Sequence, residues 1–359
     1  MMLFSSGTGR SRPARVLAVG STALLIAAAT GAKADTVSVN EMLRGVSKTR
    51  AQCNATPQAV WVSAMGRNFC MRFYLAKNGA DASRPVVFLQ GDRLGVLNLR
   101  TGAFAVPDSE RDINTEDLMK VAVSLSRQTK TTSVYLARVG LEGSSGDHRV
   151  RHSVLELNAT NAALEAIKKR YKFDGFHLVG QSGGAHLVAG LLGLRQDIGC
   201  AVIGSGPLAP IRRANYGEDP ALEHFNPISN LPAILRNHAG RIIVITDVAD
   251  KKVGAEKQTL FVRTLQVAGR PVEHYFVHAL DENHHGVVAY ARLALSGCLK
   301  GAKQEEIALD VDRLVRSRVA ASKAKPERRP DIARDGVTTG NEAEGSPNSI
   351  APKTYDVSK

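Results

Sequence analysis

Short apolar runs alternate with helical segments along the middle of the chain, and this alternation restricts the fold more than any other feature. The runs are continuously apolar, as at 85–90 and 241–246, which is typical of parallel strands buried on both faces. The pattern predicts an α/β protein with a mostly parallel central sheet flanked by helices. The expected strands are 59–64, 69–76, 85–90, 132–139, 176–179, 201–204, 241–246 and 273–277, and the expected helices are 118–128, 152–171, 184–194, 256–268, 287–295 and 304–320.

The composition is that of an ordinary folded domain. Of the 359 residues, 43% are hydrophobic and 23% are charged, which excludes a collagen, a coiled coil and a wholly disordered chain. We expect one α/β domain over 35–320, with an N-terminal hairpin extension at 35–80 and a small Pro-rich lid at 207–232. The segment 321–359 is rich in Lys, Glu, Pro, Gly and Ser without apolar periodicity, so we expect a disordered tail.

The positive charge is spread along the chain. The formal net charge is +13, but basic residues form only short clusters such as Arg212-Arg213. A solubilising surface charge is therefore the favoured interpretation, and no nucleic-acid partner is expected. Arg212 and Arg213 in the lid, together with Arg149, offer an alternative interpretation, in which they favour an acidic substrate. The sequence does not indicate the oligomeric state.

The N-terminus has the three parts of a secretory signal peptide. Three arginines between Arg10 and Arg15 precede an apolar run at 16–30, and Ala32-Lys33-Ala34 supplies small residues before a cleavage point. The apolar run is shorter than the about 20 residues that cross a bilayer comfortably. We therefore expect a signal peptide at 1–34, a mature chain that starts at Asp35, and a periplasmic or secreted protein without a stable membrane span. An uncleaved membrane anchor is the alternative.

Four cysteines follow the signal segment. They are Cys53, Cys70, Cys200 and Cys298. An even number in an exported protein favours two disulfides, with three possible connectivities. We expect Cys53–Cys70 around the predicted hairpin and Cys200–Cys298 between a central strand and a late helix, with buried free thiols as the alternative.

The strongest chemical signal is the sequence Gly180-Gln181-Ser182-Gly183-Gly184 between an expected strand and an expected helix. In this context, G-x-S-x-G predicts a nucleophile elbow, a strained turn that exposes a serine beside a helix N-terminus. A Gly-rich turn without chemistry and a phosphate-binding turn are the alternatives. The phosphate site is disfavoured because the Gly-Lys-Ser/Thr of a P-loop is absent. We therefore expect Ser182 to be the nucleophile.

A serine nucleophile needs a base and an acid that orients the base, in the chain order Ser, Asp, His for this fold. Asp250 lies in the loop after 241–246 and is the expected acid, with Asp247 in reserve. His285 precedes Gly286 in the loop after the last strand and is the expected base, with His284 in reserve. A loop carboxylate paired with a neighbouring lysine is the alternative for the acid.

Four histidines gather near the end of the predicted core. A zinc site formed by His274, His278, His284 and His285 is the alternative to a catalytic base. His274 and His278 are four residues apart, but on a strand this spacing does not create the ligand pair of a helical zinc motif. We therefore expect no metal and no cofactor.

Two backbone N–H groups complete the expected serine site. An oxyanion hole takes one N–H from the residue after the nucleophile and one from the loop after the third strand. These donors are expected to be Gly183 and Asp92, the latter following Gln90-Gly91. A simple turn is the alternative for 90–93.

From about Pro85 to about Leu295, the chain resembles the α/β-hydrolase superfamily and is most similar to dienelactone-hydrolase and prolyl-oligopeptidase-like catalytic domains. The resemblance rests on Gln90-Gly91 (where the family usually has His-Gly), Gly143-Ser144-Ser145-Gly146, the 180–184 elbow, Asn226-Pro227-Ile228, Asp250-x-x-Val253 and His285-Gly286. It implies an α/β-hydrolase fold and acyl transfer to Ser182. The roughly 50 mature residues before this core are too few for the β-propeller of the oligopeptidases.

The sequence thus predicts an exported serine hydrolase, most readily a carboxylic ester hydrolase with a small-molecule substrate. A peptidase of the prolyl-oligopeptidase-like type without a propeller, and a catalytically inactive binding protein on the same fold, are the alternatives.

Overall fold

The structure, a computed structural model, describes residues 38–78, 83–93, 97–98, 103–104, 113–209, 219–237 and 240–323. The predicted signal peptide at 1–34 and nearly all of the predicted tail lie outside these ranges, as do Arg212 and Arg213 of the predicted lid. Among the described helices, none is long and apolar enough to cross a membrane.

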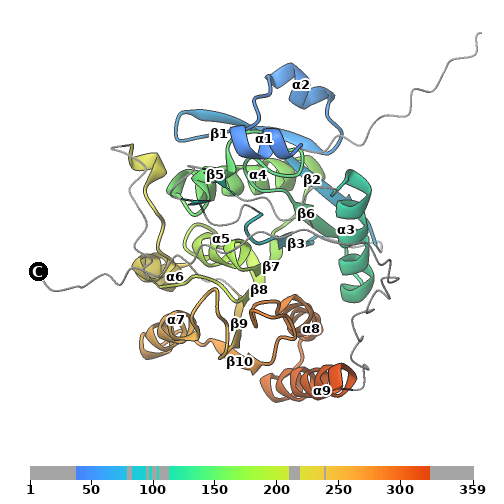
Figure 1. Ribbon diagram of the computed structural model, residues 1–359, viewed down its shortest axis with the longest axis vertical. Helices are drawn as coiled ribbons and strands as arrows, with labels where there is room; N and C mark the ends of the chain where they lie inside the picture. Colours follow the sequence, from blue (N-terminus) through green and yellow to red (C-terminus); the bar gives the residue numbers. More distant parts are fainter. Residues whose placement is uncertain are drawn as a thin grey trace, which may run out of the picture.

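Eight strands form one sheet in the order β1-β2-β6-β3-β7-β8-β9-β10 (Figure 1). β2 runs antiparallel to β1 and β6, and all other neighbours are parallel. This confirms the expected α/β class with a mostly parallel sheet. The strands are β1 (Ala59–Ala64), β2 (Arg67–Ala76), β3 (Val86–Leu89), β6 (Ser133–Leu136), β7 (Phe176–Gln181), β8 (Ile198–Gly204), β9 (Arg241–Asp247) and β10 (Glu273–Val277), with a separate pair β4 (Leu97–Asn98) and β5 (Ala103–Phe104).

The hairpin that the sequence suggested as an N-terminal extension is part of this sheet. β2 pairs with β6 in the register Phe73↔Leu136, so β1 and β2 form the edge of the main sheet. The pairing joins residues about sixty positions apart, and the hydrophobic pattern of the hairpin alone does not predict it. Both faces of β2 are consequently buried over most of its length.

Helices cover both faces of the sheet, as its alternating side chains require. Val87 and Leu89 of β3 belong to a core shared with α4, α5, α6 and α7, whereas Val86 and Phe88 belong to a core shared with α3, α8 and α9. Figure 1 shows the second set together on one side of the sheet. The longer helices are α3 (Thr115–Thr129), α4 (Val154–Tyr171), α5 (Gly183–Leu192), α7 (Ala255–Val267), α8 (Val288–Leu299) and α9 (Gln304–Lys323), and the shorter ones are α1 (Val39–Arg44), α2 (Arg50–Ala55) and α6 (Leu231–Arg236).

The described part of the predicted lid packs against the domain. Leu208 and Ala221 are buried and belong to the core on the α4–α5 side of the sheet. Short 3₁₀ turns at Pro220–Leu222 and Pro227–Asn230 lead from this segment into α6. A covering role for the segment at 207–232 stays a prediction.

All four cysteines are paired as expected. Cys53–Cys70 links α2 to β2, and Cys200–Cys298 links β8 to α8. Each bond limits the freedom of the unfolded chain, and the effect is larger for the second because 98 residues separate its cysteines.

Two histidines on the sheet make the stability of the fold depend on pH. His177 lies on β7 and His274 on β10, where the Nε2 atom of His274 lies 2.8 Å from the Thr246 hydroxyl. Burial lowers the pKa of His274 to about 4. Burial, together with the charge of Arg84, lowers the pKa of His177 to about 4. Because the unfolded chain binds these protons near pH 6.5, it holds more protons than the native state between pH 6.5 and 4.

We therefore expect the free energy of unfolding to fall as the pH decreases from about 6.5 to about 4. Above about pH 6.5 both histidines are neutral in the native and the unfolded state, so they add no further dependence on pH. His274→Gln, whose amide can still donate to Thr246, should make the dependence less steep. Urea unfolding at several pH values measures the slope for both proteins. An equal slope in His274→Gln and the wild type would contradict the assignment.

Candidate active site

Ser182 forms the turn between β7 and α5. Its backbone adopts φ 54° and ψ −120°, a conformation that residues other than glycine rarely adopt. Gly184 allows the close packing of this turn, because a Cβ there would lie 2.0 Å from the backbone oxygen of Leu89. A strained serine between strand and helix, on a mostly parallel sheet covered by helices, is the α/β-hydrolase arrangement that the sequence predicts.

The loop after β3 lies directly beside this serine. A Cβ built on Gly91 would be 3.1 Å from the Ser182 Cβ and 3.8 Å from its hydroxyl oxygen. Gly183 begins α5, where backbone N–H groups lack partners within the helix. Among the described residues, none accepts a hydrogen bond from the N–H of Asp92 or of Gly183. The N–H groups of both expected oxyanion donors therefore have no acceptor among the described residues, and Gly183 and Asp92 directly follow Ser182 and Gly91 in the chain.

A buried arginine fixes the loop after β3. Arg138, which follows β6, is 1% exposed and forms two hydrogen bonds with Glu156 on α4, at 2.9 and 3.0 Å. It also donates to the Gln90 carbonyl at 3.3 Å and to the Asp92 carboxylate at 2.8 Å. A buried arginine that is paired and hydrogen-bonded in this way holds its partners in one geometry. Arg138 therefore joins α4 to the loop that carries an expected oxyanion donor.

The Asp92 side chain has a role that the sequence did not indicate. Its carboxylate lies 3.2 Å from the Nε2 atom of His152 and 3.4 Å from the Nε atom of Arg151. Burial alone would raise the pKa of Asp92, but its interactions with His152 and with the Arg138 guanidinium outweigh burial and hold this pKa well below its usual value. A Cβ on Gly183 would lie 2.1 Å from this carboxylate, so the charged cluster is packed against the residue after the nucleophile.

Two aspartate–histidine pairs lie side by side in the loops after β9 and β10. The Nδ1 atom of His285 is 2.8 Å from the Asp250 carboxylate, which is fully buried and accepts the N–H groups of Lys252 and Val253 at 2.9 and 3.0 Å. The Nδ1 atom of His284 is 3.3 Å from Asp247. The structure thus brings together both the preferred residues and the reserve residues, as separate pairs.

The Asp250–His285 pair is held against the serine strand. Gln181, directly before Ser182, donates its side-chain amide to the His285 carbonyl at 2.7 Å. Asp281 accepts the N–H groups of His285 and Gly286 at 3.1 and 2.6 Å and thereby shapes the same loop. The Ser182 hydroxyl and the His285 ring, both among the described atoms, do not form a hydrogen bond with one another.

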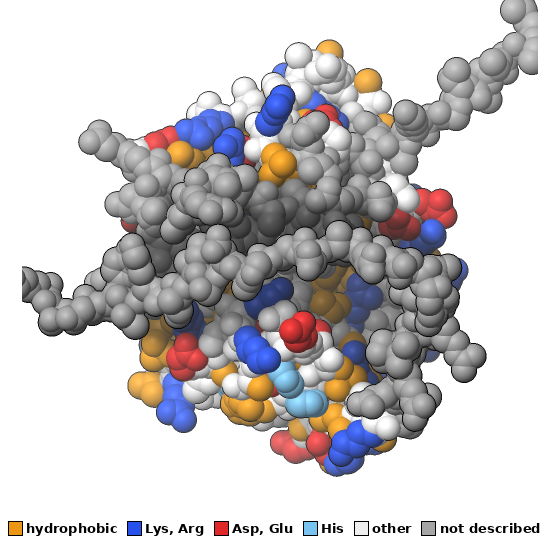
Figure 2. Space-filling model, in the orientation of Figure 1, with side chains coloured by type: hydrophobic (Ala, Val, Ile, Leu, Met, Phe, Trp, Pro, Cys, Tyr) orange, Lys and Arg blue, Asp and Glu red, His pale blue; other side chains and the backbone are white. Residues whose placement is uncertain are grey.

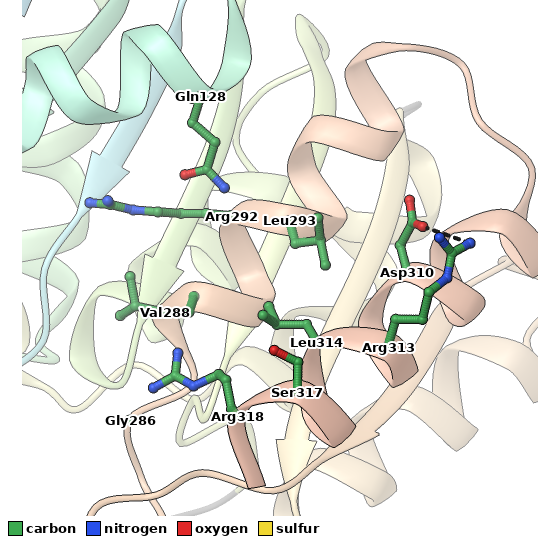
Figure 3. Close-up of a pocket in the computed structure, with 11 residues that line it drawn as sticks. Gln128, Gly286, Val288, Arg292, Leu293, Asp310, Arg313, Leu314, Ser317 and Arg318 are labelled. Carbon is green, nitrogen blue, oxygen red and sulfur yellow. Dashed lines mark ion pairs between the residues drawn. The ribbon is translucent and has the colours of Figure 1, made fainter. Parts of the chain in front are cut away.

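A surface groove of about 900 Å³ lies between α3, α8 and α9 (Figure 3). Its lining includes Gly286, Val288, Arg292, Leu314 and Arg318, but not Ser182 or Asp250. The groove therefore adjoins the loop of His285 without containing the serine.

Arg149, for which the sequence leaves a role in binding an acidic substrate as an alternative to surface charge, forms a local ion pair at the surface. Its guanidinium is exposed and lies 2.7 Å from the Asp147 carboxylate, two residues away.

Sequence reasoning missed Arg138, Glu156 and His152, because charged residues far apart in the chain usually indicate a solvated surface.

Comparisons with known proteins found no matching protein-family model and no matching curated protein. Among solved structures, the Pyrococcus furiosus esterase Pf2001 is 17% identical, with 71% of this chain and 96% of that chain covered and a TM-score of 0.49. An acylaminoacyl peptidase from Pyrococcus horikoshii is 12% identical, with 70% and 44% covered and a TM-score of 0.47. A putative α/β hydrolase from Agrobacterium tumefaciens is 14% identical, with 75% and 99% covered and a TM-score of 0.40. Similarity at this level does not identify a reaction.

Proposed function

We propose that this protein is an exported serine hydrolase that cleaves carboxylic esters through an acyl-enzyme on Ser182. The observation that carries the proposal is the 2.8 Å contact between Asp250 and His285, held by Gln181 against the strand that ends at the strained serine. The two disulfides favour the exported location, because such bonds persist in oxidising compartments.

In this mechanism, the Ser182 oxygen attacks the ester carbonyl while the Nε2 atom of His285 takes the hydroxyl proton. His285 then gives this proton to the departing alcohol, and the acyl group stays on Ser182. A water molecule, deprotonated by the same ring, attacks the acyl-enzyme, and the ring then returns that proton to the Ser182 oxygen as the acid is released. Asp250 holds the Nδ1–H tautomer and stabilises the charged ring, because its buried carboxylate faces that nitrogen.

The N–H groups of Gly183 and Asp92 are proposed to stabilise the negative charge that develops on the carbonyl oxygen. A single donor of this kind contributes roughly 2.7–4 kcal/mol in other serine hydrolases. Arg138 is proposed to act as a positioning residue, because it donates to both Gln90 and Asp92.

A fluorophosphonate probe tests the nucleophile without any assumption about the substrate. We expect one probe per chain, attached to Ser182, because the probe reacts with activated serines and needs the neighbouring base. Mass spectrometry of the digested adduct identifies the modified residue. Ser205 is a matched internal reference, since it also has a positive φ of 47° and follows the neighbouring strand β8.

Labelling at Ser205 or the absence of labelling would contradict the proposal, and the latter outcome would favour an inactive binding protein on this fold. For a labelled enzyme, a panel of chromogenic esters and aminoacyl substrates distinguishes the ester hydrolase from a peptidase.

A further inference from the structure

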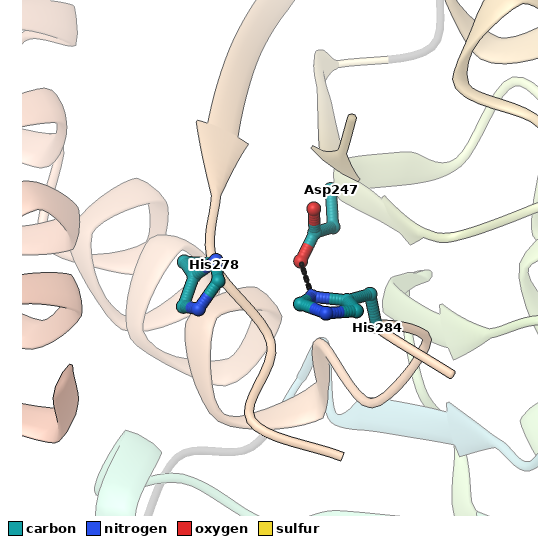
Figure 4. Close-up of side chains that lie close together, drawn as sticks. All are labelled: Asp247, His278 and His284. Atoms are coloured by element: carbon teal, nitrogen blue, oxygen red, sulfur yellow. Dashed lines mark hydrogen bonds and ion pairs between the residues drawn. The ribbon is translucent and has the colours of Figure 1, made fainter. Parts of the chain in front are cut away.

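A second group of polar side chains lies beside the proposed triad, and the proposed reaction does not use it. Asp247 is the last residue of β9, His278 follows β10, and His284 precedes the proposed base. The ligand-bearing atoms of these three side chains all lie within 4.8 Å of one another. Figure 4 shows the Asp247 carboxylate directed at the His284 ring, with His278 beside them at the end of β10.

We propose that Asp247, His278 and His284 bind one Zn²⁺ ion, with water in the fourth position. Two imidazole nitrogens and one carboxylate oxygen form a ligand set that suits zinc and disfavours magnesium and calcium, which prefer oxygen ligands. Solvent can reach the site because the His278 side chain is exposed.

The parallel pairing of the two strands produces this arrangement. Val277 of β10 lies opposite Asp247 of β9, so the next residue, His278, leaves the sheet close to the carboxylate. His284 has a φ of 52°, a left-handed conformation that is uncommon for histidine. Its ring nevertheless contacts both partners, since its Nδ1 atom is 3.3 Å from Asp247 and its centroid is 5.1 Å from that of His278.

Hydrogen bonds already fix the orientation of the Asp247 carboxylate, as they do for carboxylate ligands in metal sites. Asp247 is 1% exposed, and its two oxygens accept the N–H groups of Ala249 and Ala279 at 2.8 and 2.7 Å. Such hydrogen bonds orient ligating carboxylates in metal sites. With bonds of 2.0–2.1 Å, tetrahedral zinc places its ligands about 3.4 Å apart, which matches the 3.3 Å between Asp247 and His284. Only the exposed His278 ring needs to move closer.

The other two histidines of this region are engaged elsewhere. His274 lies 2.8 Å from the Thr246 hydroxyl and His285 lies 2.8 Å from Asp250. The four-histidine zinc site considered from the sequence therefore does not form, and a site of two histidines and one aspartate replaces it. The bound ion would join the two loops that carry Asp250 and His285.

Isothermal titration of the EDTA-treated mature protein with ZnCl₂ tests the site, and it does not require catalytic activity. We expect one ion per chain with micromolar affinity, an increase in the melting temperature with Zn²⁺, and no binding of Mg²⁺ or Ca²⁺. His278→Ala should bind Zn²⁺ at least tenfold more weakly. This substitution removes an exposed side chain, so circular dichroism should match that of the wild type.

Two variants serve as controls for position. Asn283→Ala changes the same loop without removing a ligand and should bind as the wild type does, and so should His285→Ala. The proposal is overturned if the wild type does not bind Zn²⁺ or if His278→Ala binds it with unchanged affinity. It is also overturned if only His285→Ala loses binding, because the ion would then occupy the Asp250–His285 pair.

Discussion

Ser182→Ala is expected to lower the turnover of a short p-nitrophenyl ester by a factor on the order of 10⁴ to 10⁶, as loss of the nucleophile does in characterised serine hydrolases. The variant has no hydroxyl to form the acyl-enzyme, and the remaining backbone donors can only assist attack by water. Alanine keeps the Cβ and needs the same backbone angles as serine, φ 54° and ψ −120°. The melting temperature should therefore change little. Initial rates measured against an enzyme-free blank give the ratio.

Ser205→Ala is the matched control for this experiment. Ser205 also has a positive φ, its side chain is fully buried, and its hydroxyl has no hydrogen-bond partner among the described residues. We expect turnover close to that of the wild type. Wild-type turnover in Ser182→Ala would contradict a mechanism based on Ser182. Loss of activity in Ser205→Ala alone would assign the nucleophile to Ser205, which follows β8.

The sheet was predictable because its signals are local. Continuous apolar runs marked β3, β7 and β9, and the structure places these strands at nearly the expected positions. The elbow was predictable for the same reason, since five consecutive residues between a strand and a helix specify it. Pairing between distant segments leaves no local signal, so the sequence predicts an N-terminal extension where the structure has β2 paired with β6.

The short N-terminal helices were missed although a local signal was available. Ser38 and Glu41 form a capping box at the start of α1, and Thr49 and Gln52 form one at the start of α2. Such boxes mark helix starts. Each helix has only six residues, so apolar periodicity could not show either of them.

The candidate site was predictable in its residue types and only partly in its pairing. The sequence offered two aspartates and two histidines, and it ranked them by loop position alone. The structure uses all four, because Asp247 and Asp250 each face a different histidine. The cluster of Arg138, Glu156 and Asp92 depends on contacts between β6, α4 and the loop after β3, and no local pattern in the sequence indicates these contacts.

Substitutions can distinguish the two aspartate–histidine pairs. His285→Ala should lower ester turnover nearly as much as Ser182→Ala, because an unassisted serine hydroxyl is a weak nucleophile. Asp250→Asn should lower ester turnover by a factor of about 10⁴. The same loss is seen when the aspartate of a trypsin-type triad is changed to asparagine and the imidazole adopts the wrong tautomer. Steady-state kinetics together with the rate of fluorophosphonate labelling separate these effects from changes in substrate binding.

His284→Ala is the matched control, because it removes the neighbouring ring from the same loop and leaves the Asp250–His285 contact in place. We expect it to keep most of the wild-type turnover. Asp247→Asn is a poorer control, since the buried carboxylate accepts two backbone N–H groups and its loss would disturb both loops. An active His285→Ala beside an inactive His284→Ala would assign the base to the Asp247 pair. That result would leave the serine mechanism intact, but it would remove His284 from the proposed zinc site, because one imidazole nitrogen cannot serve both roles.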